Sequence, residues 1–156
     1  MKNLRITLLA IILLVVSLAC SLSVSGSPTN QSPGVSGLVP KPSGLIDTVT
    51  MAKDTQGSAK DPINPTTVFA NTDKFHAVVH LNNAPTDTQL KAIWYAVVVG
   101  SASENNQVID STNVTGSGSV NIDFSLTPDT NFPTGTYQVE IYVNGVLDKV
   151  VEFSVQ

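Results

Sequence analysis

Apolar and polar side chains alternate strictly near the end of this chain, and that alternation constrains the fold more than any other feature. In 135–143 every second residue is apolar, and the pattern resumes in 146–155 after Asn144 and Gly145. A period of two is that of a β-strand with one buried face. Two such runs separated by Asn-Gly predict a β-hairpin.

The spacing of the two runs also predicts the register of this hairpin. A two-residue Asn-Gly turn would set the apolar face of one strand against the polar face of the other, so one residue must be absorbed. We expect a three-residue loop with Gly145 in its left-handed third position, because glycine adopts a positive φ without strain. The resulting opposed pairs are Ile141 with Leu147, Tyr137 with Val151, and Glu140 with Asp148.

Similar patterns earlier in the chain predict further strands. Alternation or short apolar runs mark 45–52, 66–70, 75–81, 108–112 and 120–126. The segment 89–99 fits either a helix that begins at Thr86-Asp87 or a strand, and its aromatic and β-branched residues favour the strand. Proline and glycine predict a loop at 53–65, and polar residues predict a turn at 113–119. Seven or eight short strands predict an all-β fold, a two-layer antiparallel β-sandwich over 45–156.

The first nineteen residues have the pattern of an export signal. Lys2 and Arg5 precede an unbroken apolar run at 8–16, which ends in Ser17, Leu18, Ala19 and Cys20. This run is shorter than the ~20 apolar residues that a membrane-spanning helix needs. We therefore predict a signal peptide over 1–19.

The four residues that end at Cys20 resemble the lipobox of bacterial lipoproteins. Cys20 is the only cysteine of the chain, and the family carries its diacylglyceryl group on such a cysteine. The resemblance implies a bacterial lipoprotein with lipidation at Cys20, located outside the cytoplasm in the cell envelope and anchored to the membrane through acyl chains. The alternative is ordinary cleavage after Ala19, which would leave a free thiol.

Composition separates a tether from the folded domain and limits the partners. Residues 20–44 are mostly Ser, Pro, Gly and Thr, which predicts a disordered tether. Without Lys2 and Arg5, six basic residues remain against twelve acidic ones, a formal charge of −6. Nucleic acid and anionic lipid both attract basic clusters, so we expect no nucleic-acid partner.

Two positions in the predicted sandwich resemble immunoglobulin and fibronectin type III domains. Trp94 stands where such domains bury a tryptophan on their third strand, and 133–137 resembles the tyrosine corner before the penultimate strand. Val139 departs from the pattern, since antibody domains place a cysteine there. The resemblance implies an immunoglobulin-like β-sandwich, an architecture that hosts many functions.

A search for catalytic and metal-binding patterns yields no residue that we assign to chemistry. His76 and His80 lie about 13 Å apart if 75–81 is a strand, too far to share a metal ion, so we expect solvated side chains. Glu140 and Asp148 are also expected to be solvated surface charges. Calcium at Asp54, Asp61 and Asp129 is the weaker alternative. We predict no catalytic residue, no metal, no cofactor and no enzymatic activity.

One sheet face is the candidate binding site. If Trp94 is buried, the neighbouring positions point outward and form an apolar patch: Ile93, Tyr95, Val97 and Tyr142, with Lys91, Gln138 and Glu140 at its rim. The patch predicts a protein or glycan partner, unless a loop or the tether covers it. The expected function is a lipid-anchored, non-enzymatic binding module. The alternatives are a structural spacer or assembly subunit of the envelope, and an accessory domain of an envelope enzyme.

Overall fold

The protein is described by a computed structural model over residues 34–100 and 104–156. The described residues form nine β-strands and no helix, so none of their segments is a helix long and apolar enough to cross a membrane. The strands are β1 (Ile46–Gln56), β2 (Asp61–Pro65), β3 (Val68–Phe69), β4 (Phe75–Leu81), β5 (Ala84–Val99), β6 (Gln107–Gly118), β7 (Asn121–Leu126), β8 (Gly135–Val143) and β9 (Val146–Val155).

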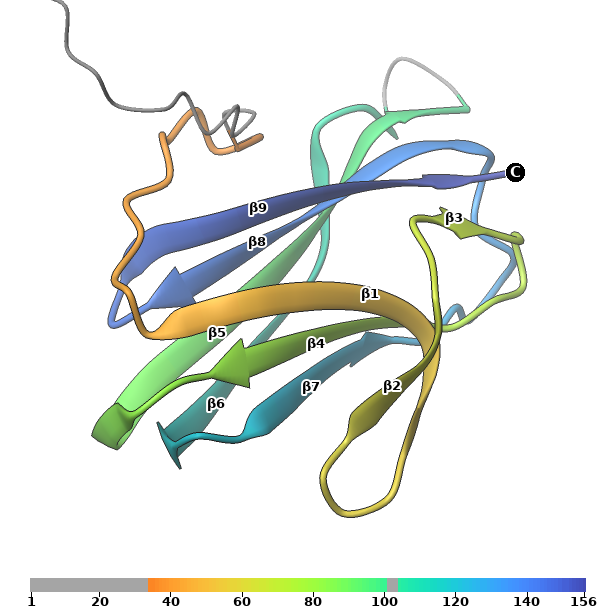
Figure 1. The fold of residues 1–156 in the computed structure, drawn as a ribbon. Helices are drawn as coiled ribbons and strands as arrows, with labels where there is room; N and C mark the ends of the chain where they lie inside the picture. The colour runs from red at the N-terminus through yellow and green to blue at the C-terminus, as the bar shows by residue number, and fades with distance from the viewer. Residues whose placement is uncertain (1–33, 101–103) are drawn as a thin grey trace, which may run out of the picture.

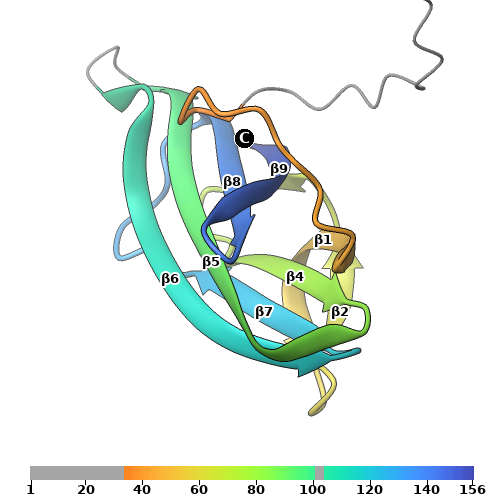
Figure 2. The same cartoon turned by 90° about the vertical axis from the view of Figure 1, so that its left-hand side faces the viewer.

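The strands form two sheets that pack face to face (Figures 1 and 2). One sheet has the order β2-β1-β4-β7, and the other has the order β3-β9-β8-β5-β6. All neighbours are antiparallel except β3 and β9, which are parallel. The prediction of an all-β two-layer sandwich is confirmed.

Aromatic side chains from both sheets fill the space between the layers. Phe75 of β4 lies 4.9 Å from Phe153 of β9 and 4.4 Å from Phe132, measured between ring centroids. Trp94 of β5 meets Phe153 edge-on at 5.9 Å and is fully buried. The segment 89–99 is therefore a strand, as its β-branched and aromatic residues indicated, and its tryptophan faces the core.

The predicted loop at 53–65 is wrong. The chain continues as β1 to Gln56 and returns as β2, which contains Pro62 and Pro65. Proline cannot donate a ladder hydrogen bond, so it is tolerated on an edge strand whose N–H would face away from the sheet. β2 is such an edge, because β1 is its only neighbour.

The predicted turn at 113–119 is also largely wrong. β6 runs from Gln107 to Gly118 and pairs with β5 almost throughout, so the expected short edge strand at 108–112 is twelve residues long. Ser, Thr, Asn and Gly fill much of this strand, and they suggest a loop when read by composition. In the sheet their backbone groups bond to β5, which compensates for the weak apolar pattern.

The final hairpin absorbs its extra residue in a strand and not in the turn. Asn144 and Gly145 have φ angles of 48° and 83°, as a two-residue turn with two positive φ values requires. Leu147 pairs with Tyr142, and Lys149 pairs with Ile141, so Asp148 is the additional residue of a β-bulge. The prediction of a three-residue loop is therefore wrong. The observed opposed pairs are Tyr137 with Phe153 and Glu140 with Val150.

Candidate binding surfaces

The predicted binding face lies on the outer side of the five-stranded sheet, where the sequence placed it, but it is not open. Tyr95 and Tyr142 are only 7% and 9% exposed, and Ile93 and Val97 are half-buried. Their neighbours Gln138 and Glu140 are buried as well and do not form a solvated rim. Another part of the chain therefore covers much of this face.

The cover is the segment 34–43, which we call the strap. It is the orange segment beside β8 and β9 in Figure 1. The backbone N–H of Val35 donates to the Gln138 side chain at 2.8 Å, and that of Lys41 donates to the Leu147 carbonyl at 2.8 Å. The strap thus crosses β8 and then follows β9. In this part of the predicted tether, residues 34–43 pack on the sheet.

Gly34 is required where the strap first meets the sheet. A Cβ atom at this position would lie 2.2 Å from Oε1 of Glu140 and 2.8 Å from its Cδ. A Cβ atom does not approach another heavy atom this closely, so any side chain at Gly34 would force the strap or Glu140 to move. The glycine therefore allows the backbone to approach a buried carboxylate closely.

Glu140 is the centre of a buried polar cluster under the strap. The Tyr142 hydroxyl donates to Oε2 at 2.6 Å, and the N–H of Ser36 donates to Oε1 at 3.0 Å. Burial, followed by the hydrogen bond to Glu140, raises the pKa of Tyr142 to about 12. Burial and the charge of Glu140 also raise the pKa of Tyr95. The expectation that Glu140 is a solvated charge is wrong. Its carboxylate is buried, and the Ser36 N–H of the strap and the Tyr142 hydroxyl donate hydrogen bonds to it.

Asp148 is the second buried acid, and the expectation of a solvated side chain is wrong here too. It is 1% exposed, it sits at the bulge of β9, and its Oδ2 accepts a hydrogen bond from the N–H of Ser43. Its Oδ1 has no partner among the described residues. Glu140 and Asp148 thus hold the two ends of the strap through backbone N–H groups.

The two histidines lie on the outer face of the other sheet, and only one is solvent-accessible. His80 is half-buried and contacts Asn121 of β7 at 2.8 Å. His76 is 5% exposed, and its Nδ1 lies 3.0 Å from Oδ1 of Asp123, so the expectation of a solvated His76 is wrong. The described residues hold no group of three or more His, Cys, Asp or Glu side chains that could bind a metal ion.

The sequence prediction placed an edge strand at 108–112 but underestimated the length of what is the most exposed strand among the described residues. β6 is the outer edge of the five-stranded sheet, with β5 as its only ladder partner among the described strands. Nine of its twelve residues are exposed. Figure 2 shows β6 running along the side of the molecule. The signal in the sequence was the run of β-branched Val, Ile and Thr between polar residues at 107–118.

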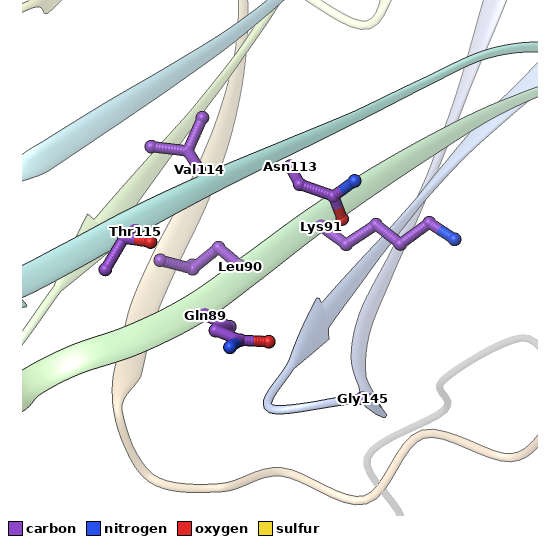
Figure 3. A pocket seen from close by; sticks show the side chains of 7 residues that line it. All are labelled: Gln89, Leu90, Lys91, Asn113, Val114, Thr115 and Gly145. Atoms are coloured by element: carbon purple, nitrogen blue, oxygen red, sulfur yellow. The ribbon is translucent and has the colours of Figure 1, made fainter.

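Hollows border β6 along its length. One of about 350 Å³ lies where Lys91 of β5 and Asn113 of β6 stand opposite each other (Figure 3). A second, of about 450 Å³, lies between Ile109, Asp110 and the segment 125–133. A third, of about 300 Å³, is mostly apolar and includes Gln107 and Tyr137. The edge therefore combines free backbone groups with recesses for side chains.

Two aromatic side chains, Phe132 and Tyr137, line hollows that border β6. All nine Phe, Tyr and Trp residues of the chain are buried except Phe132, which is half-buried. Tyr137 donates its hydroxyl hydrogen to the Pro133 carbonyl at 2.6 Å, inside the segment that resembled a tyrosine corner. Few aromatic faces are therefore exposed for stacking on a ligand.

Comparison with known proteins gives little. No protein-family model and no curated protein matches the chain. Among solved structures, the Pseudomonas fluorescens alkylpurine DNA glycosylase AlkC, bound to DNA containing an abasic site analog, is similar at 13% identity with a TM-score of 0.41. The match covers 69% of this chain and 30% of that protein, so the chain spans less than a third of its length.

This comparison corrects the expectations of a non-enzymatic module and of no nucleic-acid partner. The neighbour is an enzyme bound to DNA, so neither absence has support from known structures, and we withdraw both. A TM-score of 0.41 equally provides no argument that this chain binds DNA or acts on it. Cys20, the predicted lipidation site, lies outside the described residues.

Proposed function

We propose that the protein is an envelope lipoprotein, anchored through acyl chains on Cys20, whose β-sandwich binds extended polypeptide by strand addition to β6. The observation that carries this proposal is the twelve-residue edge strand with nine exposed residues. Such an edge presents a row of backbone N–H and C=O groups, which an incoming strand can pair. The adjacent hollows would receive alternate side chains of that strand.

Crosslinking in the producing cells tests strand addition. A photo-reactive amino acid replaces Thr115, which is exposed on β6, or Thr48, which is exposed on β1 of the other sheet. Polypeptide adducts are expected from position 115 and not from position 48. The substitution Thr112→Lys should remove them, because a lysine in the middle of an edge strand hinders pairing. Equal adducts at both positions would contradict the proposal.

The anchor is tested separately. Mass analysis of the mature N-terminus should show Cys20 carrying acyl chains, and Cys20→Ala should release the protein from membranes. Recovery of an unmodified N-terminal Cys20 would leave strand addition standing but would remove the lipoprotein assignment.

A further inference from the structure

We propose that the strand added to β6 is β6 of a second copy of this chain, so that two five-stranded sheets join edge to edge as one ten-stranded sheet. This inference rests on the proposed function, since it names the partner of the same edge. It follows from how the chain protects its sheet edges, from the charges on β6, and from where the strap leaves each domain.

Most other sheet edges carry a feature that hinders pairing, although β2 pairs with β1 only from Ala52 to Gln56. β2 contains Pro62 and Pro65, and β7 has only six residues. The β9 edge is covered by β3 at one end and by the strap at the other. β6 has neither proline nor lysine, and no strand or strap among the described residues covers it. Proteins usually block long exposed edges, so an unblocked one indicates a pairing partner.

The charges on β6 permit pairing of the strand with itself. Asp110 is its only charged residue. In an antiparallel pair centred on Asn113, Asp110 faces Gly116 of the partner subunit, and Ser111 faces Thr115 of the partner subunit. The two Asp110 carboxylates are then six residues apart along the strands, roughly 20 Å, which is more than the ~8 Å Debye length at physiological salt. Like-charge repulsion therefore does not oppose this register.

The position of the strap also suits a pair of copies on one membrane. Edge-to-edge antiparallel pairing of identical strands places the twofold axis perpendicular to the sheet, so both outer faces point the same way. Gln138 and Glu140 hold the start of the strap on that outer face. Gly34, to which the anchored segment is joined, therefore lies on the same side of both copies. Two lipid anchors can then enter a single bilayer.

Disulfide trapping of the full-length protein in its own membranes tests the pairing. Residues on the twofold axis face their own copies with Cβ atoms about 4.5–5.5 Å apart, close to the separation a disulfide requires. Asn113→Cys is therefore expected to give a disulfide-linked dimer under mild oxidation. Thr115→Cys lies two residues from the axis, so its two thiols are roughly 14 Å apart. It should remain monomeric unless Ser111→Cys is added.

Two further variants exclude collision and misfolding. Thr48→Cys is exposed on the other sheet and should give no dimer. Adding Thr112→Lys to Asn113→Cys should abolish the dimer while the circular dichroism spectrum stays unchanged. A monomeric Asn113→Cys protein, or equal trapping at Thr48→Cys, would overturn self-pairing. If either of these outcomes is found but a photo-reactive residue at position 115 still crosslinks to other polypeptides, the proposal of strand addition to β6 stands without self-pairing. If those adducts are also absent, both proposals fail.

Discussion

The two edges of the five-stranded sheet differ in nearly every respect. At the β9 edge, β3 and the strap cover the backbone, and the acids Glu140 and Asp148 are buried beneath or beside the strap. At the β6 edge, nine of twelve residues are exposed and the one acid is Asp110. The difference shows that the charge of a residue in this chain does not predict its exposure. The Ser- and Thr-rich strand β6 is exposed, whereas the carboxylates of Glu140 and Asp148 are buried.

Removing the buried carboxylate should have the largest effect on this comparison. Glu140→Ala would leave the Ser36 N–H and the Tyr142 hydroxyl without their acceptor, and we expect a loss of about 3 kcal/mol in the free energy of unfolding. Urea denaturation of the mature domain measures this loss. Glu152→Ala, at an exposed acid on β9, is the matched control and should change stability by less than about 0.5 kcal/mol. Equal losses in the two variants would show that the hydrogen bonds of Glu140 stabilise the fold no more than an exposed carboxylate does.

A side chain at the start of the strap should have the next largest effect. Gly34→Val places atoms where Oε1 of Glu140 now lies, and the resulting overpacking should cost roughly 1–3 kcal/mol. Hydrogen exchange at the Val35 and Ser36 amides should quicken, while β5 and β8 stay protected. Leu38→Ala, at an exposed strap position, provides the control. An unchanged exchange rate in Gly34→Val would show that the strap does not depend on this close approach.

Much of the fold could be predicted from the sequence, because alternation reports which residues face a core. Alternation predicted the strand at 75–81, and Phe75 and Val79 within it are fully buried. What covers an outer face is not encoded locally. The N–H groups that hold Glu140 and Asp148 come from residues 104 and 105 positions earlier in the chain. A Ser- and Pro-rich segment gave no sign of that contact.

The full length of the edge strand, predicted only at 108–112, escaped prediction for a different reason. The side chains of β6 contribute little to the core, and only Gly116 is buried while Val114 packs partly against it. With the core face so sparsely marked, the period of two is lost. Backbone pairing with β5 makes 107–118 a strand, and that pairing is a tertiary interaction.

A smaller effect is expected from titration of Tyr142, which lies beside Glu140. Tyr142 has its pKa raised from 10.0 to about 12, because burial and Glu140 favour the neutral phenol. Its contribution to stability is therefore complete below pH 10 and is lost as the pH rises towards 12. Tyr142→Phe should remove this part of the alkaline decline. Ultraviolet difference titration should show one fewer late-titrating phenol in the variant, and an identical titration would argue against burial of Tyr142 beside Glu140.

The smallest effect is predicted at the open edge. Ser111→Ala and Thr115→Ala remove exposed side chains with no described hydrogen bond, so the free energy of unfolding of the monomer should change by less than about 0.5 kcal/mol each. Denaturation at low protein concentration measures this. A loss comparable to that of Glu140→Ala would show that β6 is held by contacts within one copy and would remove the contrast between the two edges.

Docking of the strap sets a ceiling on how far the sandwich can travel from a bilayer. Had the chain been free from Ser21 to Gly44, 24 residues could have spanned at most ~80 Å. With the strap fixed from Gly34 onward, 13 residues remain, and they can span no more than ~45 Å. A lipid at Cys20 would then confine the domain to a shallow layer above the headgroups. Confinement of this kind raises local concentration in two dimensions, so even weak contacts between neighbours become populated.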